Sequence, residues 1–168
     1  MTEFHRNCVE KILAAKEWKK IGIENIEIRA LTTEHDDETV GFKFFTPKFV
    51  LSYSSDTAYK KELIEQYSKS DILILNHTHP FGTKKPKTLS SDDVIKIINK
   101  AKPKLTILTH FGSKLINTNP IYEAREIQKQ TGAQVIAAED GMTIDPISYS
   151  AGLKQKTLNL YRKNNSNP

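Results

Sequence analysis

The chain has 168 residues and a formal net charge of +5, which predicts one globular domain with a substantial core. Its single cysteine, Cys8, excludes a disulfide framework within the chain and a cysteine zinc cluster. No apolar run approaches the roughly 20 residues that cross a bilayer, and residues 1–6 lack the apolar core of a signal peptide. We therefore expect a soluble, cytoplasmic protein with no membrane association.

The spacing of apolar residues predicts helices and strands in alternation. In chain order, the sequence predicts a helix over 7–20, a strand over 23–31, a hairpin of strands over 40–45 and 49–53, and a helix over 58–68. There follow a buried strand over 71–75, a loop over 76–87 and a helix that begins at Ser90 or Ser91. The remaining elements are a strand from Leu105 to His110, a helix over 120–130, strands over 133–138 and 142–144, and a helix over 151–162 before a disordered tail. This order indicates an α/β fold with a mixed β-sheet and flanking helices.

Three potential metal ligands each follow an apolar run with the composition of a strand. They are His35, Asp56 and His110. Open α/β sheets keep their chemistry at strand ends, so we expect these side chains to meet at one edge of the sheet. Neutral imidazole and carboxylate bind zinc, manganese or ferrous iron, and such a metal lowers the pKa of its bound water to about 7. The spacing equally allows a loop histidine, a helix-capping aspartate and a strand-end histidine bonded to the backbone.

A second group of candidates follows the buried strand. His77 and His79 stand two residues apart, a spacing that on a strand places both rings on one face and can chelate a metal. Pro80 and Gly82 instead favour a loop near the mouth of the site, where it would contact substrate. Other catalytic classes lack their motifs: there is no glycine-rich phosphate loop, no Gly-x-Ser-x-Gly elbow and no evident partner for Cys8.

Five segments match a known family in order. They are Glu34-His35 followed by Gly41-Phe42-Lys43-Phe44, then Tyr53-Ser54-Ser55-Asp56-Thr57, Asp71-Ile72-Leu73-Ile74-Leu75-Asn76, Leu108-Thr109-His110-Phe111 and Ala137-Ala138-Glu139-Asp140-Gly141. With these segments the chain resembles the second half of the metallo-β-lactamase superfamily, and most closely the prokaryotic hydrolases similar to ribonuclease Z. The resemblance covers residues 23–144. It implies half of an αββα sandwich within residues 1–150 and a tail over 151–168.

The resemblance also implies a hydrolytic site with two metal ions, usually zinc, that activate a bridging hydroxide. By this resemblance His35 would bind the first ion, Asp56 would bridge both ions as the catalytic carboxylate, and His110 would bind the second. The family's His-x-His-x-Asp-His run is absent from this sequence. Catalytic zinc needs three protein ligands around one ion. We therefore expect an incomplete metal site, weakly active or inactive in this chain alone.

A further departure from the family concerns substrate contact. Many relatives carry a histidine just before the Leu-Ser pair that opens a helix, and this chain has Thr88 at that position. Thr88, His77 and His79 are the candidates for contact with substrate.

The implied half sandwich also predicts a partner. A lone half would expose one face of its sheet, including residues such as Val40, Phe42, Phe44, Leu73 and Leu105. Monomers seldom tolerate a large apolar patch. We expect either a separate chain that supplies the missing N-terminal half or a homodimer.

Two functions are open from the sequence. The first is the C-terminal part of a metal-dependent hydrolase, and the second is a non-catalytic binding or assembly module. The positive net charge suits nucleic acid, contacted through its phosphates, although a lysine-coated solvent face explains the same charge.

Overall fold

The computed structural model describes residues 3–9, 19–36, 39–83 and 85–149. Most of the helix predicted over 7–20, and the whole tail predicted over 151–168, lie outside these ranges. In the described part, no helix is long and apolar enough to cross a membrane.

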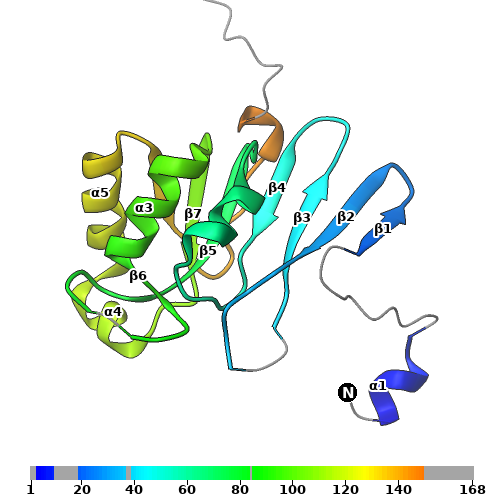
Figure 1. Cartoon of the computed structure of the whole chain (residues 1–168), viewed down its shortest axis with the longest axis horizontal. Helices are drawn as coiled ribbons and strands as arrows, with labels where there is room; N and C mark the ends of the chain where they lie inside the picture. The colour runs from blue at the N-terminus through cyan, green and yellow to red at the C-terminus, as the bar shows by residue number, and fades with distance from the viewer. Residues whose placement is uncertain (1–2, 10–18, 37–38, 84, 150–168) are drawn as a thin grey trace, which may run out of the picture.

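One mixed β-sheet forms the centre of the protein (Figure 1). Its path is β1-β2-β3-β4-β5-β7-β8, and the short β6 pairs with β5. The strands are β1 (Lys20–Ile23), β2 (Ile26–Leu31), β3 (Gly41–Phe45), β4 (Val50–Tyr53), β5 (Ile72–His79), β6 (Leu89–Ser90), β7 (Leu105–Thr109) and β8 (Gln134–Ala137). β1 to β4 pair antiparallel, whereas β4, β5, β7 and β8 pair parallel. As a result β2, β4, β5, β7 and β8 run in one direction and end at one edge of the sheet.

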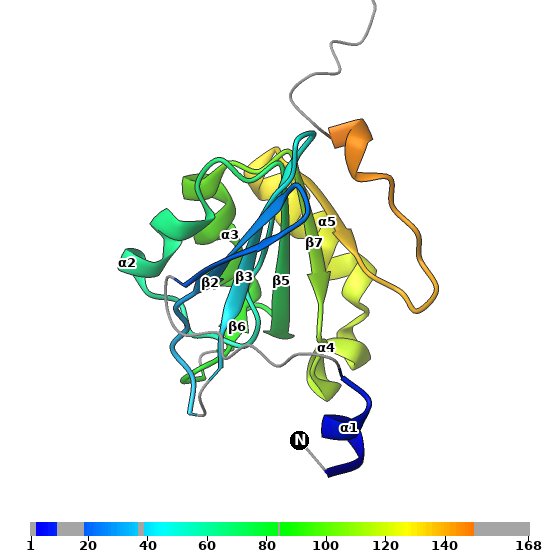
Figure 2. The ribbon, with the colours of Figure 1, turned by 90° about the vertical axis from the view of Figure 1, so that its right-hand side faces the viewer.

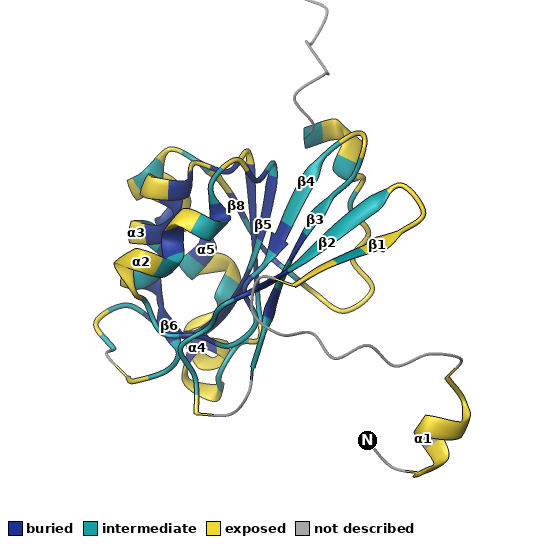
Figure 3. Ribbon diagram, turned by 45° about the vertical axis from the view of Figure 1, so that its right-hand side comes forward, coloured by how far each residue is buried: buried dark blue, intermediate teal, exposed yellow. Residues whose placement is uncertain are grey.

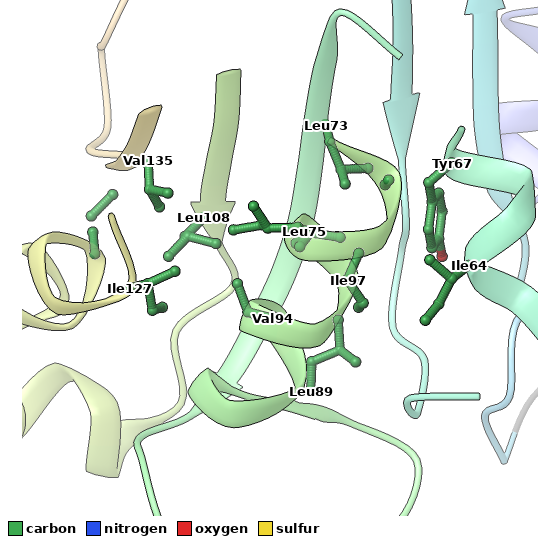
Figure 4. Packing of buried hydrophobic residues seen from close by; sticks show 14 of the residues in the cluster. Ile64, Tyr67, Leu73, Leu75, Leu89, Val94, Ile97, Leu108, Ile127 and Val135 are labelled. Atoms are coloured by element: carbon green, nitrogen blue, oxygen red, sulfur yellow. The ribbon is translucent and has the colours of Figure 1, made fainter. Parts of the chain in front are cut away.

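Helices cover one face of this sheet, and Figure 2 shows α2 and α3 on that side. The helical elements are α1 (Glu3–Asn7), α2 (Lys61–Ile64), the 3-10 turn η1 (Glu65–Tyr67), α3 (Ser91–Ala101), α4 (Ser113–Thr118), α5 (Pro120–Thr131) and the 3-10 turn η2 (Pro146–Tyr149). In Figure 4, Leu75 and Leu108 of the strands point towards Val94, Ile97 and Ile127 of α3 and α5. All five side chains are at most 2% exposed. Burying a side chain of this size stabilises the fold by about 1.5–3 kcal/mol.

Both long helices begin and end where local chemistry predicts. Ser90 caps α3: its hydroxyl accepts a hydrogen bond from the Asp93 backbone N–H, and the Asp93 carboxylate accepts one from the Ser90 N–H. Pro120 occupies the first turn of α5, where its missing N–H costs nothing. Gly132 ends α5 with a φ of 67°, a conformation that glycine adopts freely.

The opposite face of the sheet is covered only in part by the described residues. Ile72 and Leu105 are buried there, and Ile144, just before η2, and Tyr149, at the end of η2, pack against this cluster. Figure 2 shows the segment around η2 on the side away from α2 and α3. Towards β3 the same face becomes half-exposed, as the teal strands of Figure 3 show. Its half-exposed residues, which the strand register places in two rows, are Phe42, Phe44, Leu51, Tyr53, Ile74 and Ile136.

The predicted exposure of this face is therefore partly wrong. Leu73 is fully buried because it points to the helical side, and Leu105 is fully buried on its own side of the sheet. Val40, Phe42 and Phe44 are only partly buried among the residues that the structure describes.

Several predicted elements differ from the structure. The helix over 7–20 is wrong at both described ends, because α1 stops at Asn7 and β1 starts at Lys20. The single strand over 23–31 is a hairpin of β1 and β2 that turns at Glu24, whose φ is 51°. The helix over 58–68 shrinks to α2 and η1. No strand forms at 142–144 in the described chain, because β8 ends the sheet.

A buried lysine ties β3 to the helical layer. Lys43 points to the helical side of the sheet, and its Nζ donates hydrogen bonds to the carbonyls of Gln66 at 3.0 Å and Ser68 at 2.5 Å. Burial, together with the nearby positive charges of Arg29 and Lys69, lowers the pKa of Lys43 to about 8. The contact joins the end of η1 to the centre of the sheet.

This lysine predicts a pH-dependent stability. Between pH 8 and pH 10.5 the unfolded chain keeps the Lys43 proton that the folded chain has lost, so the free energy of unfolding rises with pH in this window. Lys43→Met abolishes that rise. We therefore expect the free energy of unfolding of the wild type, minus that of the variant, to increase by on the order of 1 kcal/mol from pH 7.5 to pH 10. Urea unfolding at both pH values measures it. Lys48→Met, at an exposed turn, serves as the control and should follow the wild type; parallel behaviour of Lys43→Met would contradict the assignment.

Candidate functional site

The strands that run in one direction bring four loops to the same edge of the sheet. His35 follows β2, Asp56 follows β4, His79 ends β5 and His110 follows β7. Hydrogen bonds join the first two of these loops, since the Glu34 N–H donates to the Thr57 hydroxyl at 2.9 Å. Chemistry in parallel sheets is located at this kind of edge.

Asp56 and His110 meet at this edge. Nε2 of His110 lies 3.4 Å from Oδ1 of Asp56. The Asp56 side chain is 26% exposed and the His110 side chain 57%, so both reach solvent. A carboxylate and an imidazole at this distance, open to solvent, are a donor pair that suits zinc or another divalent transition metal.

Asn76 holds the carboxylate in place. Its Nδ2 donates to Oδ1 of Asp56 at 2.9 Å, and its backbone N–H donates to the Ser54 hydroxyl at 3.1 Å. Asn76 is 4% exposed and belongs to β5. No role was predicted for this residue from the sequence, although a polar side chain at the end of the apolar run of β5 was a usable signal.

His35 does not complete a three-ligand cluster. Its Nδ1 lies 3.5 Å from the Thr39 hydroxyl, within its own loop. Among the residues that the structure describes, no group of three or more His, Cys, Asp or Glu side chains is arranged to hold a metal ion. The structure therefore brings together Asp56 and His110, and it leaves His35 in the loop bonded to the Asp56 loop.

The backbone of His110 is strained. Its φ is 59°, in the left-handed region that costs a non-glycine residue about 1–2 kcal/mol. The following residues anchor the loop: the Gly112 N–H donates to the Thr78 carbonyl at 3.2 Å. A Cβ at Gly112 would lie 2.5 Å from that carbonyl oxygen, so only glycine fits so close to β5.

His77 lies on a strand and not in the predicted loop. β5 continues to His79 because β6 pairs with it, so the loop predicted over 76–87 begins later. His77 is fully buried, and its Nε2 lies 2.9 Å from the Ser91 hydroxyl and 3.0 Å from the His79 carbonyl. Burial lowers the pKa of His77 to about 4, so its ring is neutral near pH 7. The contact of this neutral ring with Ser91 joins β5 to the start of α3.

His79 lies in a more open and more basic environment. Its Nε2 lies 3.0 Å from the Thr88 hydroxyl. Burial lowers the pKa of His79, and the charges of Lys85 and Lys114 add to the effect. Lys87, one residue before Thr88, pairs with Asp36 of the His35 loop. Contact of His77, His79 or Thr88 with substrate stays a prediction; of the three, His79 and Thr88 are the partly exposed ones.

The side chains at this edge are of the types that bind a metal ion, but the described residues supply too few of them. Asp56 and His110 supply one carboxylate and one imidazole, and catalytic zinc takes three protein ligands. The described residues therefore supply at most two metal ligands at this edge, and no catalytic step through a metal follows from them alone.

Comparison with known families places this edge in context. The sequence model of the family described as the beta-lactamase superfamily domain matches residues 2–111, which include β1 to β7 and the residues Asp56, Asn76 and His110.

Individual proteins are also similar to this chain. The chain is 31% identical over 148 residues to "Uncharacterized protein MJ1374" of Methanocaldococcus jannaschii, a match that covers 86% of this chain and 55% of the relative. The metallo-beta-lactamase fold protein YhfI from Bacillus subtilis is similar with a TM-score of 0.70 and 17% identity, over 83% of this chain and 59% of YhfI. Igni18, a metallo hydrolase from Ignicoccus hospitalis, is similar with a TM-score of 0.63 and 14% identity, over 79% of this chain and 59% of Igni18. The two structural similarities show the fold, and the chain spans little more than half the length of these proteins.

The close approach at Gly112 generates a prediction. Gly112→Ala places a methyl group against the Thr78 carbonyl, and overpacking of this kind costs about 1–3 kcal/mol. We expect lower thermal stability and loss of the Asp56–His110 contact, seen as a displaced His110 ring signal in NMR spectra. Gly22→Ala, in β1 with no atom within 4 Å of the added Cβ, is the matched control. An unchanged His110 signal in Gly112→Ala would contradict this role of the glycine.

Proposed function

Because the chain belongs to the metallo-β-lactamase superfamily, we propose that it forms part of a metal-dependent hydrolase whose metal site includes Asp56 and His110. The observation that supports this most directly is the contact of 3.4 Å between these two side chains at the carboxyl edge of the sheet. Both side chains reach solvent, and Asn76 orients the carboxylate. An arrangement with a fixed carboxylate next to an open imidazole suits a metal ligand pair.

Zinc is the metal we propose, with manganese or iron as alternatives. Imidazole and carboxylate are ligands that zinc accepts in catalytic sites. A bound ion of this kind lowers the pKa of its water, which supplies the nucleophile for hydrolysis. In a site with two ions, Asp56 would bridge them as the catalytic carboxylate, His110 would bind one ion and His35 the other.

The remaining ligands must come from residues outside the described set. We propose that they belong to a second β-sheet that packs on the half-exposed face defined by Phe42, Phe44, Leu51 and Ile74, in either a separate chain or a second copy of this chain. That face is apolar and only partly covered by Ile144 and Tyr149. Aligned packing of two sheets would bury it.

The second hypothesis is a non-catalytic binding or assembly module. The net charge of +5 is compatible with contacts to nucleic-acid phosphates. The two hypotheses make opposite predictions about metal, and a strong dependence of nucleic-acid affinity on salt would favour the second.

Metal titration tests the hydrolase proposal. We expect zinc to bind only weakly to this chain in isothermal titration calorimetry, because two protein ligands are fewer than a catalytic zinc site has. Both Asp56→Asn and His110→Ala should lower the affinity at least about tenfold further, because each removes a ligand. Asp145→Asn is the control, because it is an equally conservative change at an exposed residue just before η2. This variant should bind zinc as the wild type does. Absence of zinc binding in a folded wild type would refute the metal role and favour the binding module.

The half-exposed apolar face predicts association. We expect the purified chain to be dimeric, or aggregated without its partner, in light-scattering measurements, because an exposed apolar face is seldom stable in a monomer. Phe42→Lys combined with Phe44→Lys should shift it towards monomer. Tyr122→Lys, at a 72% exposed residue of α5 on the helical side, is the control. A soluble, monodisperse wild-type monomer would count strongly against the proposed partner.

A further inference from the structure

We propose that the half-buried Glu123 and the buried Ser91 and His77 form a hydrogen-bonded network that positions His110 at the edge of the sheet through Phe111. The three residues, which we name the Glu123–Ser91–His77 network, come from α5, α3 and β5. The inference extends the proposed function, because it concerns a residue proposed to contact the metal. In this role His77, Ser91 and Glu123 are positioning residues.

The direction of each hydrogen bond in the network can be deduced. The Ser91 hydroxyl donates its single proton to the Glu123 carboxylate. His77 Nε2, at 2.9 Å from the same hydroxyl oxygen, must then be the donor to it. The His79 carbonyl, 3.0 Å from Nε2, is a second acceptor for this proton. His77 is therefore the neutral tautomer with its proton on Nε2, and the network locks the plane of its ring.

The locked ring contacts the residue next to His110. The rings of His77 and Phe111 are 6.2 Å apart with planes at 82°, an edge-to-face arrangement. Phe111 packs against the main core, and the next residue, Gly112, is bonded to Thr78 of β5. The chain after His110 is thus held at two successive positions.

Two observations indicate that this network does more than stabilise the core. Nδ1 of His77 is buried without a hydrogen-bond partner among the described residues, so an apolar side chain would fill the same space without an unmatched acceptor. His110 adopts a left-handed backbone conformation although its side chain is largely exposed. A strained, exposed residue persists only where its surroundings fix it, and strain of this kind gathers at functional sites.

The network would act on His110 by restricting its ring to the position next to Asp56. Residues that orient a metal ligand typically change metal affinity by 10-fold to 100-fold when they are replaced. The Asp56–His110 contact is present in the protein without a metal, so the effect of the network on this contact can be measured without zinc.

The test compares Ser91→Ala and His77→Leu with the wild type by NMR of the histidine rings. We expect one sharp His110 ring signal, with a nuclear Overhauser contact to Asp56, in the wild type. Both variants should shift or split this signal, weaken the contact and lower zinc affinity at least about tenfold. His77→Gln, whose amide can still donate to Ser91, should restore part of the wild-type signal. Ile127→Val, which removes a methyl group from the buried side of α5, is the control that lowers stability without touching the network.

The outcomes separate the two proposals. If Ser91→Ala and His77→Leu lower thermal stability as Ile127→Val does but keep the wild-type His110 signal, the network is only structural and the inference is overturned. If zinc binds to no variant, the wild type included, while the His110 signal still depends on the network, the proposed function fails and the inference stands. Should Ser91→Ala not fold, Glu123→Gln decides, because it keeps the shape and weakens only the acceptor; an unchanged His110 signal there overturns the inference.

Discussion

The parallel pairing of β4, β5 and β7 is the constraint on which the site depends. Tyr53 lies opposite Ile74, and Asn76 lies opposite Thr109. The next residues of β4 and β7 therefore leave the sheet on either side of β5, and Asp56 and His110 meet beside Asn76. Residues 54 positions apart in sequence come within contact distance only because parallel strands end at one edge. A slip of one residue in β5 would turn Asn76 away and bury its neighbours on the wrong face.

The elements that were predicted correctly have local signals. The β3–β4 hairpin follows from two apolar runs around Pro47, and α3 follows from Ser90 and the acidic residues in its first turn. The wrong predictions concern strands whose pairing partners the apolar pattern does not reveal. Gly22 resembles the end of a helix, but it lies inside β1 because β2 supplies a partner strand. β5 extends through His77 because Leu89, twelve residues later, pairs with it.

The candidate site likewise contains residues that the sequence predicted and residues that it did not. The sequence predicted that Asp56 and His110 belong to strand ends, and the strand order then brings them together. The position of His35 depends on the conformation of an irregular loop, which no periodic pattern specifies. Glu123 could not be singled out from the sequence, because its importance comes from a contact with Ser91 that the fold creates. The sequence signal of Asn76 is only a polar residue at the end of an apolar run, and its contact with Asp56 also depends on the fold. Polar residues that orient other polar residues have no spacing rule.

The two histidines of β5 show how burial assigns different roles to the same side chain. The register of β5 against β6 shifts between His77 and His79, so the strict alternation of a strand is broken between them. His77 faces the core, where lost solvation keeps it neutral and Ser91 fixes its ring. His79 stays partly open beside Thr88, among positive charges. A ring that is neutral at every physiological pH can hold a neighbour in place permanently, whereas a ring that solvent reaches is free to respond to an anionic ligand. The irregularity in β5 thus lies between His77, which is buried in the core, and His79, which is partly exposed at the edge of the sheet.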